Sequence, residues 1–352
     1  MTIFRQAHFP AAHRPPSSSD EPLVSVLICN YNYGRFVGEA IGSVLEQTYR
    51  NIELIVVDDG STDDSRQVIG AYSDRLRAIF QQNGGQGAAF NSGLAEAHGE
   101  IICFLDADDY FHREKVARVV RAFAEHPEWV QLAHNWISVD IDGRPMGRNP
   151  VRRFTRGDIR TLLLRWGRYG WGITSGLSYR RVVLERVLPI PKRPRAADTY
   201  LTATVPFYGQ VGGIADQLMY YRVHGKNRRA RSDNLPYLLQ QREDTCVCIN
   251  TAARDSGLAE RFDIRCDGDY RGFKALESGG GSWSDAFGIC WLSLREFAAL
   301  RRKPAEALAR LAQRLGCVLL PPEQARALLR LGLQGYVRSR LLGAQAPSGK
   351  SS

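Results

Sequence analysis

The chain has 352 residues, of which 44% are hydrophobic and 24% are charged, and its formal net charge at pH 7 is +10. This composition is typical of a globular protein, and no apolar run approaches the roughly 18 residues that a membrane-spanning helix needs. Its seven cysteines show neither a disulfide framework nor zinc-type spacing, which excludes the small disulfide-rich and zinc-module classes and favours a reducing cytoplasm.

Four apolar stretches of strand length alternate with helical patterns in the first third of the chain. Residues 24–29, 52–57, 76–80 and 101–105 are predicted to be buried strands, and apolar residues at helical spacing follow the first three. This alternation predicts βαβ units in an α/β, doubly wound sheet. The polar or glycine-rich loops after these strands are then expected to share one edge of the sheet.

Beyond residue 111 the alternation weakens. The predicted elements are helices at 116–123, 155–166 and 198–208 and strands at 129–139 and 211–222. From about residue 235 the pattern becomes helical, over 235–253, 284–300, 304–315 and 322–342, and Gly316 is expected to end the third of these helices. We therefore predict a disordered leader over 1–21, an α/β domain over 22–230, a helical region over 231–343 and a disordered tail over 344–352.

The fourth apolar strand ends abruptly in carboxylates. Asp106, Asp108 and Asp109 directly follow the apolar run. Three acids at the edge of a core repel one another unless a cation or hydrogen-bond donors share the site. Asp-x-Asp at the carboxyl end of a strand suits a hard divalent cation that binds a phosphate. The alternative is a solvated acidic turn that caps the next helix.

Six stretches together carry a resemblance to a known family. They are VSVLICNYN (24–32), VDDGSTD (57–63), NSGLAEAHGE (91–100), LDADD (105–109), ADTYL (197–201) and YRVHGKN (221–227). In this order they resemble glycosyltransferase family 2, over roughly residues 22–230. The resemblance implies a GT-A, Rossmann-like mixed sheet. It also implies inverting transfer of a sugar from a nucleotide diphosphate sugar to an acceptor hydroxyl.

The resemblance also implies a nucleotide pocket, with uracil as the expected base. Its expected residues follow the first strands of the sheet; they are Cys29, Tyr31, Asp58, Asp59, Gly85 and Asp106. Tyr31 would stack on the base, and Asp59 would accept a hydrogen bond from it. The alternatives are a surface aromatic for Tyr31 and a turn or helix cap for Asp58 and Asp59.

For the diphosphate, the resemblance implies a bound Mg²⁺ or Mn²⁺. Asp108 is the expected ligand, Asp106 is placed toward ribose and metal, and His224 is a third ligand or phosphate contact. The alternative for His224 is a surface histidine. The nearby basic residues would clamp phosphate or form a solvated charge run; they are Arg222, Lys226, Arg228 and Arg229.

For the acceptor, Asp198 matches the family's catalytic base, although it would also make a good helix cap. Trp171 and Ser175 belong to a glycine-rich loop that is expected to form the acceptor wall, unless Trp171 fills core. The expected acceptor is a glycan, a lipid-linked sugar or another hydroxyl, in bacterial surface polysaccharide biosynthesis. Many family members have Arg where Phe90 stands, so a phosphate or ribose contact must be missing or moved.

Two other function classes stay open at this point. Gly85-Gln86-Gly87 after a strand resembles part of a dinucleotide fingerprint and would suit a nicotinamide-dependent oxidoreductase, but Phe90 occupies the third glycine position. A non-catalytic nucleotide-sugar or glycan-binding module is the second alternative. The lack of a Gln-x-x-Arg-Trp motif and of membrane helices argues against a processive polysaccharide synthase.

The C-terminal helices are basic. Residues 295–340 contain ten Arg or Lys against three acids, and Leu308, Leu311 and Leu315 fall on one helical face. This pattern indicates either an ordinary packed helix or peripheral contact with an anionic inner membrane that carries a lipid-linked acceptor. No nucleic-acid-binding motif accompanies the positive charge, so no nucleic acid is expected as a partner.

Overall fold

The computed structural model describes residues 21–147, 153–193, 196–225 and 233–341. The predicted tail and all but the last residue of the predicted leader lie outside these residues. The chain divides into two compact units. The first comprises Met1–Thr161, Tyr169–His224 and Thr251–Ala259, and the second comprises Leu162–Arg168, Gly225–Asn250 and Glu260–Ser352. Because each unit is assembled from several segments, the domain boundary at residue 230 stays a prediction.

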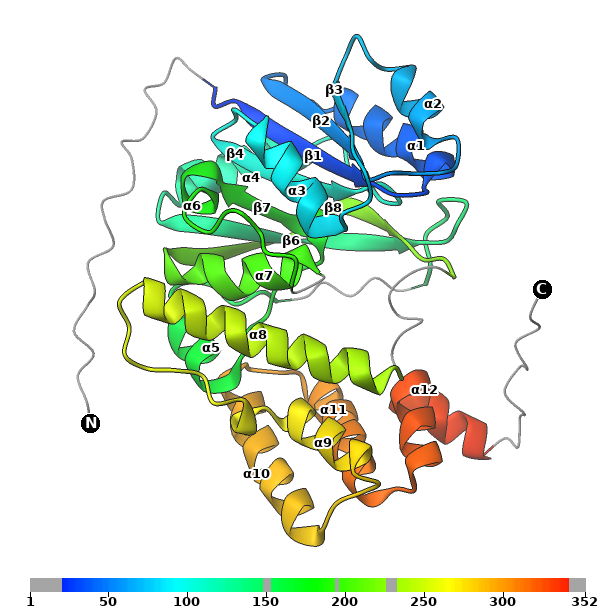
Figure 1. Cartoon of the computed structure of the whole chain (residues 1–352), viewed down its shortest axis with the longest axis vertical. Coiled ribbons are helices and arrows are strands. Elements are labelled where there is room, and N and C mark those ends of the chain that lie inside the picture. Colours follow the sequence, from blue (N-terminus) through cyan, green and yellow to red (C-terminus); the bar gives the residue numbers. More distant parts are fainter. Residues whose placement is uncertain (1–20, 148–152, 194–195, 226–232, 342–352) are drawn as a thin grey trace. The chain divides into compact units, whose positions relative to one another are not determined.

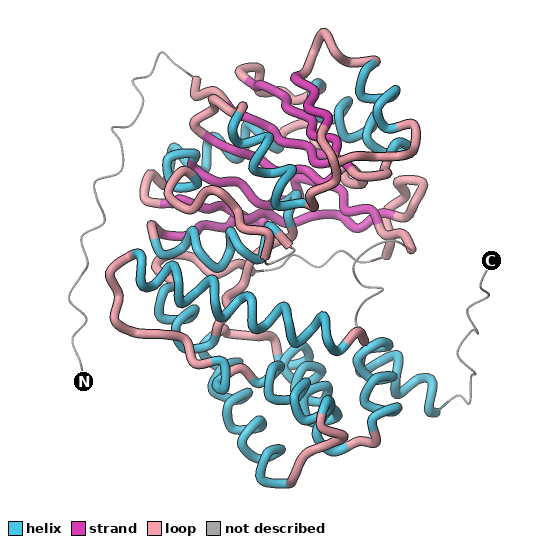
Figure 2. Tube along the Cα trace, viewed as in Figure 1, coloured by secondary structure: helices cyan, strands magenta, loops and turns pink. Residues whose placement is uncertain are grey.

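The first unit is built on one mixed sheet. Within the described residues, eight strands pair in the order β3-β2-β1-β4-β7-β6-β8-β5. Figure 2 draws the strands in magenta. They are β1 (Val24–Asn30), β2 (Ile52–Asp58), β3 (Arg77–Phe80), β4 (Ile101–Asp106), β5 (Tyr110–Phe111), β6 (Trp129–Val139), β7 (Leu177–Arg180) and β8 (Gln210–Arg222). Strands β1 to β4 are parallel, whereas β7 runs antiparallel to β4 and β6. This arrangement confirms the predicted α/β class with a mixed sheet.

Helices cover both faces of this sheet (Figure 1). Successive strand residues point to opposite faces, so Val26 and Ile28 belong to one core and Leu27 to the other. The first core is covered by α1 (Gly34–Leu45), α2 (Ser65–Gly70) and α4 (Lys115–Glu125). The second core is covered by α3 (Gln86–Ala95), α6 (Arg181–Leu184) and α7 (Ala197–Thr204). The strand ends between these layers are therefore fixed from both sides.

Some elements differ from the predicted ones. The helix predicted over 155–166 begins only at α5 (Arg160–Trp166), because Gly157 adopts φ +89° and pairs with Val211 instead. The helix predicted over 198–208 is α7, followed by a 3₁₀ turn at Val205–Phe207. Strands β5 and β7 were not predicted, because two and four residues are too few for a period to show.

The second unit is helical. Its elements are most of α5 and of α8 (Leu235–Asp255), then α9 (Gly268–Glu277), α10 (Trp283–Ala299), α11 (Pro304–Leu319) and α12 (Pro322–Leu341). The prediction for Gly316 was wrong, because it lies inside α11. A Cβ there would approach Leu328 of α12 to 2.4 Å, so the glycine allows the two helices to pack closely. No helix in the described part of the chain is long and apolar enough to cross a membrane.

A network of buried charges joins the helices of the second unit. Arg168 donates hydrogen bonds to Asp267 Oδ1 at 2.6 Å and to Asp269 Oδ2 at 2.7 Å. Arg314 donates to Asp269 Oδ1 and to Glu296 Oε2, each at 2.6 Å. Burial alone would raise the pKa of Asp269, but neighbouring arginines hold this pKa well below its usual range. The carboxylate therefore stays ionised inside the unit.

Candidate functional site

The carboxyl ends of β1, β2 and β4 lie side by side. In the sheet register Asn30 pairs with Asp58, and Cys29 pairs with Asp106. The end of β1 thus lies between the acidic ends of β2 and β4. This confirms the expectation that the strand-end loops share one edge, which is where ligands bind in open α/β sheets.

The two acids after β2 support loops in this structure. Asp58 is buried and accepts hydrogen bonds from Asn30 Nδ2 at 2.8 Å and from the Ser61 amide at 3.0 Å, as in the turn alternative. Asp59 is buried too, and accepts from Gln81 Nε2 at 2.7 Å. It also accepts from the backbone amides of Gly84 and Gly85, at 2.9 and 2.8 Å. A direct contact of Asp59 with a base therefore stays a prediction, while its control of the glycine loop is observed.

Three other predicted nucleotide residues differ in exposure. The Tyr31 side chain is 48% exposed, so its ring is accessible to a base. Gly85 has φ +84°, and no atom lies within 4 Å of a Cβ built there, so the backbone is open to a ligand. Burial, followed by the charges of Asp106 and Asp59, raises the pKa of the Cys29 thiol well above its usual value. Cys29 therefore stays a neutral thiol.

The carboxylates after β4 have different environments. Asp108 Oδ2 lies 2.9 Å from His224 Nε2, and both side chains are largely buried. Asp109 is buried and accepts hydrogen bonds from Ser175 Oγ at 2.7 Å and from the Arg222 amide at 3.0 Å. Burial raises the pKa of Asp109, and the charges of Asp108 and Asp106 raise it further. Negative charge is therefore concentrated at this strand end.

The structure brings His224 to the acidic strand end and removes the surface-loop alternative. Its ring stacks on Phe36 at 5.8 Å between centroids and meets the edge of Tyr33 at 5.6 Å. We expected Arg222 to bind phosphate or to be solvated. Instead it is buried and donates hydrogen bonds to the carbonyl oxygens of Asp108 and Ile141. The other basic residues of that expectation, Lys226, Arg228 and Arg229, lie outside the described residues.

The acidic residues after β4 fit a hard divalent cation. No group of three His, Cys, Asp or Glu side chains in the described residues is arranged to enclose an ion. Mg²⁺, however, is usually held by one or two carboxylates together with substrate phosphates and water. Asp106 and Asp108 supply such oxygens. Burial first, and then the charges of Asp108 and Asp106, raise the pKa of Asp109, and a cation would offset the repulsion among these charges.

Asp198 lies in the first turn of α7. Ala196 occupies the N-cap, so the cap alternative for Asp198 is wrong. The Asp198 carboxylate is half-buried and accepts hydrogen bonds from Thr174 Oγ1 at 3.2 Å and from the Thr199 amide at 2.7 Å. Two fixed donors therefore orient this carboxylate.

Gln86 connects the acidic end of β4 with the helix turn that carries Asp198, and it was not identified from the sequence. Its Nε2 donates to Asp106 Oδ1 at 3.2 Å, and its Oε1 accepts from the Ala197 amide at 3.3 Å. The side chain therefore links the end of β4 to the helix turn that carries Asp198. The sequence feature that could have identified Gln86 is its position as the first residue of α3, directly after the glycine loop.

The predicted acceptor wall is only partly accessible. Ser175 is fully buried, and it accepts a hydrogen bond from the Asp106 amide at 3.1 Å while it donates to Asp109. Contrary to our expectation, it supports the acidic strand end and does not face an acceptor. Trp171 is half-buried and packs on the second core, so only part of its ring can meet a sugar. Its acceptor role stays a prediction.

The structure explains why Phe90 can stand where many family members have Arg. Its side chain is 1% exposed and stacks on Phe104 with 4.2 Å between ring centroids. The position therefore belongs to the second core.

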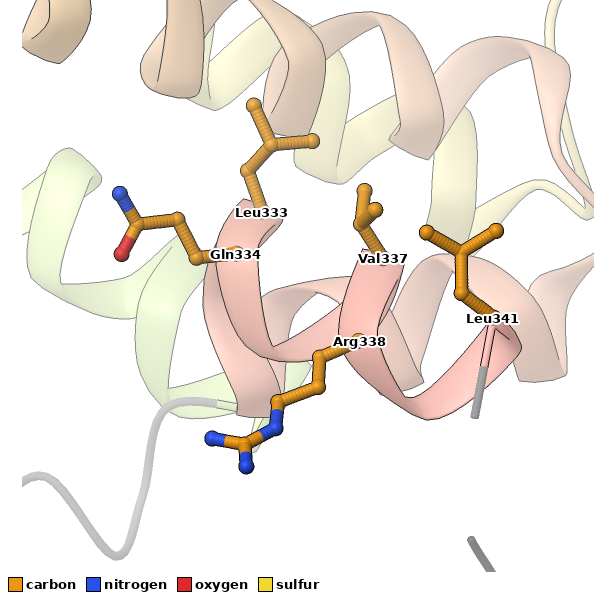
Figure 3. A pocket seen from close by; sticks show the side chains of 5 residues that line it. All are labelled: Leu333, Gln334, Val337, Arg338 and Leu341. Atoms are coloured by element: carbon orange, nitrogen blue, oxygen red, sulfur yellow. The ribbon is translucent and has the colours of Figure 1, made fainter. Parts of the chain in front are cut away.

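A separate hollow of about 470 Å³ lies along α12 and is lined by Leu333, Gln334, Val337, Arg338 and Leu341 (Figure 3). All five residues come from one helix, and none belongs to the predicted site.

Comparison with known proteins shows the family of this chain. A family model described as Glycosyl transferase family 2 matches residues 25–188. A glycosyltransferase of Nostoc sp., itself uncharacterized, is 36% identical over 285 residues, which cover 77% of this chain and 88% of the relative. The chain therefore belongs to glycosyltransferase family 2. Two further curated glycosyltransferases, of Rickettsia prowazekii and Rickettsia typhi, align over 95 residues, which span 30% of their own length.

Two solved structures share the fold. The mannosyltransferase PcManGT of Pyrobaculum calidifontis, solved with GDP-Man and Mn²⁺, superposes with a TM-score of 0.53 at 18% identity, over 97% of this chain and 92% of that one. Residues 1–349 of S. aureus TarS, solved with UDP-GlcNAc, superpose with a TM-score of 0.50 at 18% identity, over 91% and 92% of the two chains. At this identity the likeness establishes the GT-A fold.

Proposed function

We propose that this family member transfers a sugar, with inversion, from a UDP-sugar to a hydroxyl of a glycan, lipid-linked or other acceptor. The observation that carries the proposal is the acidic end of β4 joined through Gln86 to the helix turn of Asp198. The fold neighbours PcManGT and TarS were solved with nucleotide sugars, which supports a donor of that class. Family membership favours this function over the nicotinamide alternative.

The nucleotide would lie at the ends of β1 and β2. The exposed Tyr31 ring would stack on the base, and the open backbone at Gly85 would let a phosphate or ribose approach closely. Asp58 and Asp59 would act by holding the surrounding loops, through the hydrogen bonds that they accept from Ser61 and Gly84. The neutral thiol of Cys29 would pack beneath the nucleotide without adding charge.

Asp108, with Asp106 and His224, would hold Mg²⁺ or Mn²⁺. Such an ion would offset the charge that develops on the leaving diphosphate. His224 already contacts Asp108, so both side chains lie where they could share an ion. Asp109, kept in place by Ser175, would support the turn that carries Asp108 without direct contact with the ion.

Asp198 would remove the proton from the attacking acceptor hydroxyl. The donors Thr174 and Thr199 fix its carboxylate, so that an acceptor oxygen can be aligned against it. One base and an in-line attack opposite the leaving diphosphate suffice for inversion, with no covalent intermediate. The exposed part of Trp171 would guide the acceptor sugar.

The first experiment is calorimetric titration of UDP, with and without Mn²⁺, into the wild type, Asp108→Ala and a control. Asp74→Ala is the control, because Asp74 is an exposed acid in a turn of the same unit. We expect metal-dependent binding by the wild type and the control, and its loss in Asp108→Ala. Equal binding with and without metal in all three would contradict the metal role. Absence of binding would redirect the titration to dTDP and GDP.

Turnover separates an enzyme from a binding module. Release of UDP from candidate UDP-sugars, dependent on Asp198, would support transfer, whereas binding without turnover for every donor would support a non-catalytic nucleotide-sugar or glycan-binding module. For the biological setting we propose bacterial surface polysaccharide synthesis in the cytoplasm. The net charge of +10 supports peripheral contact with an anionic inner leaflet.

A further inference from the structure

Helix α10 exposes an apolar face. Trp283 is 80% exposed, Phe287 76%, Trp291 51% and Leu294 59%. Their spacing of four, four and three residues places them on one side of the helix. Single exposed apolar residues need no explanation, but a contiguous stripe with three aromatic rings indicates an interaction surface.

The stripe does not serve the packing of the second unit. Another side of α10 does that. Ala286 and Ile289 are buried with Val318 of α11 in one cluster, and Phe297 is buried as well. The helix start is fixed by a capping box between Ser282 and Asp285. Replacement of the exposed rings therefore leaves the contacts that fold the unit intact.

The charges around the stripe are positive. The two acids of α10 are engaged elsewhere, because Asp285 belongs to the capping box and Glu296 is buried against Arg314. Arg295 is exposed and lies with its guanidinium 4.3 Å from the centre of the Trp291 ring. The exposed residues Arg301 and Lys303 follow directly after the helix. The surface thus presents aromatic rings with a basic border, while the partly exposed Asp285 is held by the capping box and lies near Arg271.

We propose that this face of α10 docks on the surface of an anionic phospholipid bilayer. Tryptophan is enriched at the boundary between lipid headgroups and acyl chains, where its ring is apolar and its N–H remains hydrated. Arg295, Arg301 and Lys303 would then meet the headgroup phosphates. This inference extends the proposed membrane contact and does not depend on sugar transfer.

The structure assigns this role to α10 rather than to α11. The sequence pattern had suggested Leu308, Leu311 and Leu315 of α11 as the docking face. Leu308 is 62% exposed, but Leu311 is half-buried, and Leu315 packs on the cluster of Ala286 and Ile289. An exposed stripe is therefore continuous on α10 and interrupted on α11.

The test is sedimentation of the full chain with lipid vesicles at low salt. The vesicles are phosphatidylcholine alone or phosphatidylcholine with about 30% phosphatidylglycerol. The test variant is a double variant that carries Trp283→Ser and Phe287→Ser. The matched control is Val247→Ser, because Val247 is an apolar residue of α8 that is 64% exposed. We expect the wild type and the control to bind the anionic vesicles, and the double variant to bind at least about tenfold more weakly.

Three results would overturn the proposal. The first is that the wild type stays in the supernatant. The second is that the double variant binds the vesicles as tightly as the wild type. The third is that light scattering finds a dimer for the wild type and a monomer for the double variant. The last result would assign the stripe to a second copy of the chain. Asp108→Ala is expected to bind vesicles like the wild type, so a failure of membrane docking is distinguishable from a failure of the catalytic proposal.

Discussion

His224 Nε2 lies 2.9 Å from Asp108 Oδ2, although 116 positions separate the two residues in the chain. The contact joins a residue two positions after the end of β8 to the turn that follows β4. The imidazole is held between the rings of Tyr33 and Phe36, which come from the region after β1. Three parts of the sheet edge therefore determine where the Asp108 carboxylate points.

His224→Ala is expected to weaken Mn²⁺-dependent UDP binding by about tenfold to a hundredfold, because groups that hold or orient a metal ligand have effects of this size. Calorimetric titration measures the change. His98→Ala is the control, since His98 is an exposed histidine of the same unit. An unchanged metal-dependent affinity in His224→Ala would show that the contact with Asp108 is only structural.

Asp198→Asn is expected to lower the rate of sugar transfer by about 10²- to 10⁴-fold and to leave UDP affinity unchanged, because the amide cannot take the proton of the acceptor. The amide oxygen can still accept the hydrogen bond from the Thr199 backbone amide, and the new NH₂ group can donate to the Thr174 hydroxyl, so the local fold is retained. The measurement is UDP release at saturating donor, beside calorimetric UDP binding. Wild-type turnover by the variant would remove Asp198 from the role of base, and Asp74→Asn controls for loss of a surface charge.

Ser175→Ala is expected to lower the free energy of unfolding by about 1–3 kcal/mol. The change removes a hydroxyl that donates to buried Asp109 at 2.7 Å and accepts from the Asp106 amide at 3.1 Å. Urea denaturation measures the loss, with Ser73→Ala as an exposed control. We also expect weaker metal-dependent UDP binding, because Asp106 loses one of its fixed contacts. Wild-type stability together with wild-type binding would contradict this role.

The sequence predicted the parts of the fold that have long, regular patterns. The strands before Asn30, Asp58 and Asp106 were found because buried parallel strands are continuous apolar runs, and the shared edge followed from the alternation with helices. The short strand β7 was missed, although it separates β4 from β6 in the sheet. Gly316 was misplaced because a glycine that allows close helix packing has the same local signal as one that ends a helix.

The sequence was sufficient to predict which acidic residues form the candidate site, but not the contacts that hold them in place. That Asp106 and Asp108 occupy one strand end followed from the local pattern. The burial of Ser175 and its contact with Asp109 depend on β7 and its preceding turn, which the sequence did not reveal. Gln86 acts through contacts with residues far along the chain, so its role required the tertiary structure.

The second unit is expected to lose stability in acid because of Asp269. The Asp269 pKa is well below its usual value in the folded chain, so the unfolded chain takes up a proton first as the pH falls. The stabilisation is therefore complete above the usual aspartate pKa of about 4 and is lost progressively below it. Unfolding followed by circular dichroism in urea at a series of pH values measures this slope.

Asp269→Asn is expected to destabilise the second unit by about 3–5 kcal/mol at neutral pH, because it leaves the buried guanidinium groups of Arg168 and Arg314 with one carboxylate fewer. The variant should also show a flatter acid dependence than the wild type. Asp263→Asn is the control, since Asp263 pairs with Arg265 at the surface, where an ion pair contributes little. If Asp269→Asn and Asp263→Asn had equal stability and equal acid dependence, the buried network would not be what holds these helices together.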